Sequence, residues 1–496
     1  MLIKTIKELS SHTFIYSLAM IASSAASIFL LPVYTRYLSR TDYGILEILE
    51  YTNIFIIIMV AAGFNSAIPR FVNDAKTDKE KNLVKSTATI FILIVGLIVS
   101  LILIFFNEEL TLLILGAIEY KKLVNLNIIL LYLQVVIFIT NIGFIASKQS
   151  KIYLGYMLLK LFGTIGFCIY FIAWLQLGVL GMLYGNIIGS GLTAAILIIH
   201  NFVKNGIGIS YPHLKNILIF GLPLVPATLL ATLMHNADKY LIRYFCSLSD
   251  VGIYTLGYKF PFMLNALILQ SFNYIWVGST IYEIEKNDDS ARQYGRITTY
   301  VITFYVFAQL TLSIFSVPLV KILADTKFFP SHEIIPLISL GLCFHALYFF
   351  FSIGTFLKRK TWLVNIAYFP ATTISILGNI YLLPKYGYMA AGYLSVITYL
   401  VFTSILYITC RGLTKVEYEF KRIGQIVGLG ILIFLVCSLH IFENTVLEII
   451  KGIFLIIAFP SILIIGCWLK GDEKEFIRKK IEEIKIFFLK KSAIYR

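Results

Sequence analysis

The chain has 496 residues, of which 58% are hydrophobic and only 14% charged, and its mean hydropathy is +0.84. A soluble domain is closer to half apolar and a quarter charged, so this composition excludes an ordinary soluble protein. The net charge of +15 therefore does not indicate a nucleic-acid partner, because lysine and arginine also gather in the cytoplasmic loops of membrane proteins.

Apolar runs of about 20 residues, the length that crosses a bilayer core of about 30 Å, recur along the chain. The strands of a membrane barrel would be about ten residues long and would alternate in polarity, a pattern absent here. We therefore predict an all-α polytopic membrane protein with about 14 transmembrane helices. The predicted spans are 12–35, 43–67, 86–106, 123–146, 152–174, 178–200, 215–235, 252–278, 297–316, 334–357, 362–383, 388–410, 424–441 and 448–469.

The distribution of basic residues predicts the orientation. With the N-terminus inside, the inner segments carry 30 of the 42 lysines and arginines, and the outer segments carry 10. Cytoplasmic loops are enriched in these residues. The sequence thus predicts that both termini are cytoplasmic.

The chain contains an internal repeat. The stretch RYFCSLSDVGIYTLGY (243–258) resembles RYLSRTDYGILEILEY (36–51), and Asp42 and Gly44 recur 208 positions later as Asp250 and Gly252. Six predicted spans separate the copies, so the two halves have the same orientation and we expect them to be related by an axis along the membrane normal.

The repeat divides the chain into five predicted parts. The basic tail suits a helix on an anionic membrane surface, and a solvated helix is the alternative. The parts are an N-terminal six-helix bundle (1–203), a cytoplasmic linker (204–215), a C-terminal six-helix bundle (216–411), two additional transmembrane helices (412–470) and a basic cytoplasmic tail (471–496).

Motifs for catalysis, nucleotide binding and metal binding are absent from the sequence. The six cysteines are scattered and have no metal-ligand spacing, so we interpret them as small apolar residues. We therefore expect neither an enzyme nor a cofactor. Without an ATP site, uphill transport would need coupling to a gradient of H⁺ or Na⁺.

Two lysines lie inside predicted spans, where a charge is costly and usually functional. Lys160 lies near the middle of its span, too deep to reach either surface easily, whereas Lys259 is shallower and could also extend to the interface. Cations that line a cavity favour an anionic substrate.

Acidic residues and a histidine accompany these lysines. Glu47 and Glu50 are neighbours on one helix face and would bind a proton or cation, or pair with a lysine across the cavity. His235, Asp238 and Lys239 also share a face, where Asp238 and Lys239 either form a local ion pair or hold an outer gate.

Three arginines and a second histidine are weaker candidates. Arg36 and Arg70 bracket the first helix pair and suit either interfacial anchoring or phosphate binding, and Arg243 follows the Asp-Lys pair near the outer end of its span. His345 is either a core histidine with satisfied hydrogen bonds or a proton carrier, and the first is the simpler interpretation.

Prolines interrupt the first span of each half. Pro32 falls in the first span and Pro223 and Pro226 in the seventh. A proline removes a helix hydrogen bond and bends the helix, so these spans are candidate moving parts of alternating access.

Four stretches, residues 30–51, 61–72, 220–260 and 333–361, resemble the polysaccharide-biosynthesis (O-antigen type) flippases. That family belongs to the multidrug/oligosaccharidyl-lipid/polysaccharide exporter superfamily. The usual Asp-Arg of the family at the end of the seventh helix stands here as Asp238-Lys239, which keeps the charge but loses bidentate phosphate geometry.

The resemblance implies two six-helix bundles around a central cavity, plus two additional helices. It implies transport of undecaprenyl-pyrophosphate-linked oligosaccharide from the inner to the outer leaflet, with cavity cations on the pyrophosphate and the lipid tail in the bilayer. Polysaccharide polymerases and glycosyltransferases would be candidate protein partners.

Two alternatives stay open from the sequence. A cation-coupled multidrug antiporter of the same superfamily would depend on the carboxylates more than on Lys160. A membrane glycan polymerase or ligase would need a sizeable outer loop, and the outer loops here are short.

Overall fold

The computed structural model describes residue 22 and residues 29–439 and 445–465, and all secondary structure in these ranges is helical. Thirteen of the described helices are long and apolar enough to cross a membrane. They match the second to fourteenth predicted spans, and the prediction of an all-α polytopic membrane protein is confirmed. Most of the first predicted span and the tail 471–496 lie outside the described residues.

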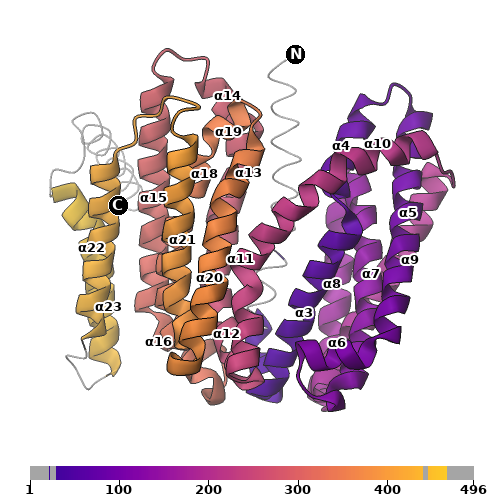
Figure 1. The fold of residues 1–496 in the computed structure, drawn as a ribbon. Helices are drawn as coiled ribbons and strands as arrows, with labels where there is room; N and C mark the ends of the chain where they lie inside the picture. Colours follow the sequence, from indigo (N-terminus) through magenta and orange to yellow (C-terminus); the bar gives the residue numbers. More distant parts are fainter. Residues whose placement is uncertain (1–21, 23–28, 440–444, 466–496) are drawn as a thin grey trace, which may run out of the picture. The chain divides into compact units, whose positions relative to one another are not determined.

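The described residues form two compact units, which lie within 1–288 with 316–415 and within 289–315 with 416–496. In the first unit, α7 packs on both α5 and α9, and α8 packs on α9; α20 packs on α11 and α21 (Figure 1). Its α-helices are α2 Leu31–Tyr37, α3 Arg40–Ala61, α4 Phe64–Asp74, α5 Asp78–Phe105, α6 Asn107–Ile114, α7 Lys121–Ala146, α8 Ser150–Ile169, α9 Gly178–Asn205, α10 Tyr211–Gly221, α11 Val225–Phe245, α12 Leu248–Asn265, α13 Ser271–Ile275, α14 Ile281–Ile284, α16 Ser316–Leu323, α17 Ile334–His345, α18 Tyr348–Phe351, α19 Ile353–Leu357, α20 Val364–Tyr386 and α21 Met389–Cys410.

Short 3₁₀ or π turns join several of these helices. They are η1 Ile118–Tyr120, η2 Tyr170–Trp174, η3 Leu222–Leu224, η4 Ala266–Gln270, η5 Trp276–Thr280, η6 Thr326–Glu333 and η7 Thr361–Leu363.

The second unit contains α15 (Ser290–Ile314), α22 (Phe420–Ser438) and α23 (Thr445–Ile465), which pack on one another. Gly295 lets the backbone approach closely, because a Cβ there would lie 1.9 Å from the carbonyl oxygen of Glu417. The predicted C-terminal bundle (216–411) includes α15, whereas the contacts of α15 group it with the two additional helices. The domain boundaries expected from the sequence stay a prediction.

The internal repeat has a structural cause at the start of α3 and α12. Ser39 accepts a hydrogen bond from the backbone N–H of Asp42, and Ser247 accepts the same bond from Asp250. These side chains satisfy N–H groups that have no partner within the helix. Both copies of the repeat therefore specify where a helix begins.

The two repeat glycines bring these helices into close contact. A Cβ at Gly44 would lie 1.9 Å from the carbonyl oxygen of Leu248, and a Cβ at Gly252 would lie 2.2 Å from that of Arg40. Real Cβ atoms do not approach this closely, so α3 and α12 can cross at this distance only with glycine at both positions. The motif that recurs after 208 positions thus specifies a close helix crossing between the two halves of the first unit.

A valine at Gly252 should push α12 away from α3 and destabilise the folded protein by about 1–3 kcal/mol, the usual cost of overpacking. Gly155→Val on α8 is the matched control, because a Cβ at Gly155 would meet no neighbouring side chain or helix within 4 Å. The thermal midpoint of the purified protein in detergent measures both. Equal midpoints for the two variants would contradict the close crossing.

Candidate functional site

Tyr43 and Glu47, four residues apart on α3, bind Lys259 on α12. The Lys259 ammonium donates to Glu47 Oε1 at 3.0 Å and to the Tyr43 hydroxyl at 2.8 Å. Lys259 also lies 5.2 Å from the centre of the Tyr43 ring. The sequence left open whether Glu47 binds a proton or cation or pairs with a lysine. In this structure Glu47 pairs with a lysine of the other half. Lys259 therefore has a partner in this conformation.

Removing one member of this pair should cost more than removing both. Lys259→Gln leaves Glu47 without its cation, whereas Glu47→Gln/Lys259→Gln leaves two neutral amides. We expect a coupling free energy of about 0.5–3 kcal/mol in a double-mutant cycle. Thermal unfolding of the four proteins in detergent measures it, and additive effects would contradict a direct pair.

Asp238 and Lys239 form a second ion pair, which lies within α11. The Lys239 side chain is 0% exposed, and its ammonium donates to Asp238 Oδ1 at 3.0 Å and to the His235 carbonyl oxygen at 2.7 Å. Tyr254 donates to the other carboxylate oxygen at 2.6 Å. The lysine also lies 3.9 Å from the centre of the Tyr258 ring. Both charges are thus neutralised inside the protein.

A cluster of rings and hydroxyl groups continues from this ion pair toward α17 and α21. His235 Nδ1 lies 2.8 Å from the Tyr399 hydroxyl, which lies 3.0 Å from the Tyr258 hydroxyl. The His345 ring lies 5.0 Å from the His235 ring. Neither ring nitrogen of His345 has a hydrogen-bond partner in the described part of the chain. His345 thus lacks the hydrogen bonds that a satisfied core histidine would make to the described residues.

Lys160 differs from the other two lysines. It lies ten residues after Ser150, or about 15 Å along α8. It makes no hydrogen bond or ion pair with any residue that the structure describes. The charge of Glu50 acts on it from α3, and Glu50 itself accepts a 3.4 Å hydrogen bond from Gln134 on α7. Lys160 thus has no direct hydrogen-bond or ion-pair partner among the residues that the structure describes.

The three arginines lie away from these groups. Arg70 on α4 is exposed and lies 4.5 Å from the centre of the Phe220 ring. Arg243 donates to the carbonyl oxygen of Leu112 at 2.9 Å and so holds the end of α6. Arg36 is exposed near the end of α2. In the described part of the chain, the contacts of Arg70 and Arg243 do not include Lys160 or Lys259.

The three prolines lie at interruptions of their helices. Pro32 is in the first turn of α2, Pro223 is in the 3₁₀ turn η3 and Pro226 is in the first turn of α11. The span Tyr211–Phe245 thus changes from α10 to α11 at the two prolines. Their role as moving parts stays a prediction.

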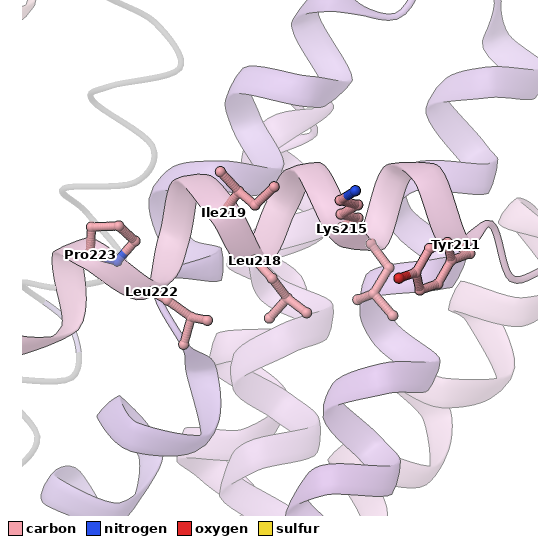
Figure 2. Close-up of a pocket in the computed structure, with 7 residues that line it drawn as sticks. Tyr211, Lys215, Leu218, Ile219, Leu222 and Pro223 are labelled. Carbon is pink, nitrogen blue, oxygen red and sulfur yellow. The ribbon is translucent and has the colours of Figure 1, made fainter.

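An open groove of about 420 Å³ runs along α10 and η3 (Figure 2). Lys215 is its charged residue. The other side chains that line it are apolar apart from Tyr211. The lining residues are Tyr211, Leu214, Lys215, Leu218, Ile219, Leu222 and Pro223.

Sequence reasoning missed the tyrosines that surround the charges. The ring centre of Tyr51 on α3 lies 5.1 Å from the Lys239 ammonium. Tyr258 also contacts Lys239, and Tyr254 donates a hydrogen bond to Asp238. Tyr399 extends the cluster through its hydroxyl, which lies close to that of Tyr258. A usable signal was present, because Tyr254 and Tyr258 are four residues apart and therefore share a face of their helix.

The model of the polysaccharide biosynthesis protein family matches residues 33–333, more than half of the chain. The chain belongs to the polysaccharide biosynthesis protein family. The match spans α3 to η6 and includes Lys160 and both ion pairs. A comparison of this chain with curated proteins found no match.

Solved structures of transporters share the fold of this polysaccharide biosynthesis protein. The lipid II flippase MurJ in an inward closed conformation is 16% identical, with a TM-score of 0.74 over 92% of this chain and 100% of the other. A multidrug resistance MATE family transporter of the MOP superfamily, in an inward-facing conformation, is 14% identical, with a TM-score of 0.65 over 82% and 95%. A MOP superfamily transporter from Pyrococcus furiosus is 16% identical, with a TM-score of 0.59 over 85% and 96%. At these identities the likeness establishes the fold.

Proposed function

We propose that the protein is a flippase that moves polyprenyl-pyrophosphate-linked oligosaccharide from the inner to the outer leaflet of a bacterial plasma membrane, for surface polysaccharide biosynthesis. The family match supports polysaccharide biosynthesis, and the shared fold supports a transporter. The protein would act as a conformational carrier, without covalent chemistry.

The observation that carries the proposal is the unpaired ammonium of Lys160. Lys239 and Lys259 are bound to Asp238 and Glu47, so their charges are already neutralised. An ammonium inside a membrane span is costly when no carboxylate is bound to it, and the pyrophosphate of a lipid carrier would lower that cost on binding. Lys160 therefore favours an anionic substrate.

The lipid part of the substrate needs an apolar surface that is continuous with the bilayer. The groove along α10 and η3 offers such a surface and carries Lys215. A polyprenyl chain would lie along the apolar side chains of this groove, where Lys215 offers a second ammonium to the anionic substrate.

Alternating access would come from movement between the two halves. The glycine crossing of α3 and α12 lies, with the predicted orientation, at the outer ends of these helices. Closing and opening this crossing, with bending at the prolines of α2, η3 and α11, would expose the substrate to one side at a time. The Glu47–Lys259 pair would hold the two halves together while the crossing is closed.

The test is the leaflet distribution of lipid-linked oligosaccharide in cells that lack the protein. The flippase function predicts accumulation on the inner leaflet and recovery when the wild-type gene is restored. A membrane-impermeant enzyme that cleaves the oligosaccharide on spheroplasts measures the outer fraction. No accumulation, together with altered sensitivity to cationic dyes, would instead support a multidrug antiporter.

A further inference from the structure

His345 occupies a break in a membrane span. The apolar segment Thr326–Leu357 is long enough to cross the bilayer, but α17 ends at His345 and α18 begins at Tyr348. At the break, Leu347 N–H donates to the carbonyl oxygen of Phe344 at 3.1 Å, which is an i→i+3 bond. Such 3₁₀ turns inside a helix often mark a functional hinge.

The side chain at this break is buried without hydrogen bonds. His345 is only 7% exposed, and neither ring nitrogen has a partner among the described residues. A neutral imidazole carries one N–H donor and one acceptor lone pair. Leaving a buried polar group unpaired costs about 1–3 kcal/mol, so native proteins rarely keep one without a reason.

Aromatic rings surround His345. From its ring centre, the distances are 5.0 Å to His235, 5.1 Å to Tyr399, 5.7 Å to Phe402 and 5.8 Å to Tyr348. The faces of such rings attract a cation, and their bulk excludes water. This environment tolerates the neutral imidazole and offers no carboxylate to a charged one.

The ionisable groups around His345 have their own partners in this conformation. The Asp238 carboxylate is bound to Lys239 and to the Tyr254 hydroxyl, so no carboxylate is available to His345. Lys239 is itself a cation that opposes a second positive charge nearby. The ionisable groups that face the cluster are His235, Asp238 and Lys239 on α11, Tyr254 and Tyr258 on α12, Tyr348 on α18, Tyr368 on α20 and Tyr399 on α21.

We propose that His345 is a proton-binding site of the transport cycle: the ring is neutral in the conformation described here and binds one proton when the break in its span opens it to water. The inference rests on the proposed function, because transport requires a second conformation. Binding of the proton and opening of the break favour each other reciprocally. For one proton, the ratio of the two conformations changes by up to tenfold per pH unit, and low pH favours the open one.

The experiment measures the conformational equilibrium without any substrate. Spin labels attached through a non-canonical amino acid at Lys79 and Lys358, both exposed, leave the six cysteines in place. Distance distributions between the labels, recorded in lipid nanodiscs from about pH 5 to pH 8, report the two conformations. The wild type should show two populations whose ratio depends on pH by up to tenfold per unit.

His345→Gln and His345→Phe should both lose this pH dependence. The phenylalanine keeps a ring among the surrounding aromatic side chains, so it tests the proposal even if the glutamine packs poorly. The control is His200→Gln, because His200 also lies in a membrane helix but is bonded to the Tyr156 hydroxyl at 2.9 Å. The control should keep the wild-type response. A pH response that survives both His345 variants, or no pH response in the wild type, would overturn the proposal.

Failure of the proton site and failure of the proposed substrate are distinguishable. The label distances do not involve lipid-linked oligosaccharide, whereas the leaflet assay does not involve pH. If the label distances in nanodiscs depend on His345 but cells that lack the protein show no inner-leaflet accumulation, the proton site stands and the proposed substrate is wrong. The reverse pair of results would keep the flippase and discard His345.

Discussion

Lys160→Ala should abolish most of the delivery of lipid-linked oligosaccharide to the outer leaflet while leaving the protein folded. Lys160 makes no hydrogen bond or ion pair with a described residue, so its removal breaks no such contact. A hydrogen bond to a charged group contributes about 1.5–3 kcal/mol, which corresponds to a loss of roughly 10- to 150-fold in substrate affinity. The measurement is outer-leaflet oligosaccharide in cells that express each variant at the same level.

Two variants make this result specific. Lys160→Arg keeps the charge and should retain transport. Lys151→Ala removes an exposed lysine at the start of α8 and should behave like the wild type. Normal transport with Lys160→Ala would leave the flippase intact and exclude Lys160 from substrate binding. Transport that instead depends on Glu47 and survives Lys160→Ala would favour the cation-coupled antiporter.

Lys239→Met should destabilise the folded protein by about 3–5 kcal/mol, the usual cost of leaving one charge of a buried pair without its partner. Asp238 would keep only the Tyr254 hydroxyl and the backbone N–H of residue 239. Methionine has a similar length, so packing changes little. The thermal midpoint and the yield of monodisperse protein in detergent measure the effect.

The double variant Asp238→Asn/Lys239→Met is the decisive comparison. It removes both charges, and apolar or neutral replacements of a buried pair are often nearly as stable as the pair itself. We therefore expect it to recover most of the lost stability. A double variant as unstable as Lys239→Met would mean that the lysine acts through its ring contacts with Tyr258 rather than through its charge.

The positions of the spans could be read from the sequence, because the cause is local. A chain in lipid must satisfy its backbone hydrogen bonds internally, so each apolar run of sufficient length becomes a helix. The spans predicted at 123–146 and 388–410 correspond to helical segments Ile118–Ala146 and Met389–Cys410. The repeat was equally local, since Asp42 and Asp250 each take part in the start of their own helix.

The sequence by itself thus determined the fold class, the repeat and the position of Lys160 within an apolar span. The tertiary structure alone decided which charges are free. Lys259 and Glu47 are 212 residues apart, and Arg243 reaches a carbonyl oxygen 131 residues away. Residue spacing defines the face of a helix but not the helix that packs against it. Only the packed chain therefore distinguishes a paired lysine from one that is available to a substrate.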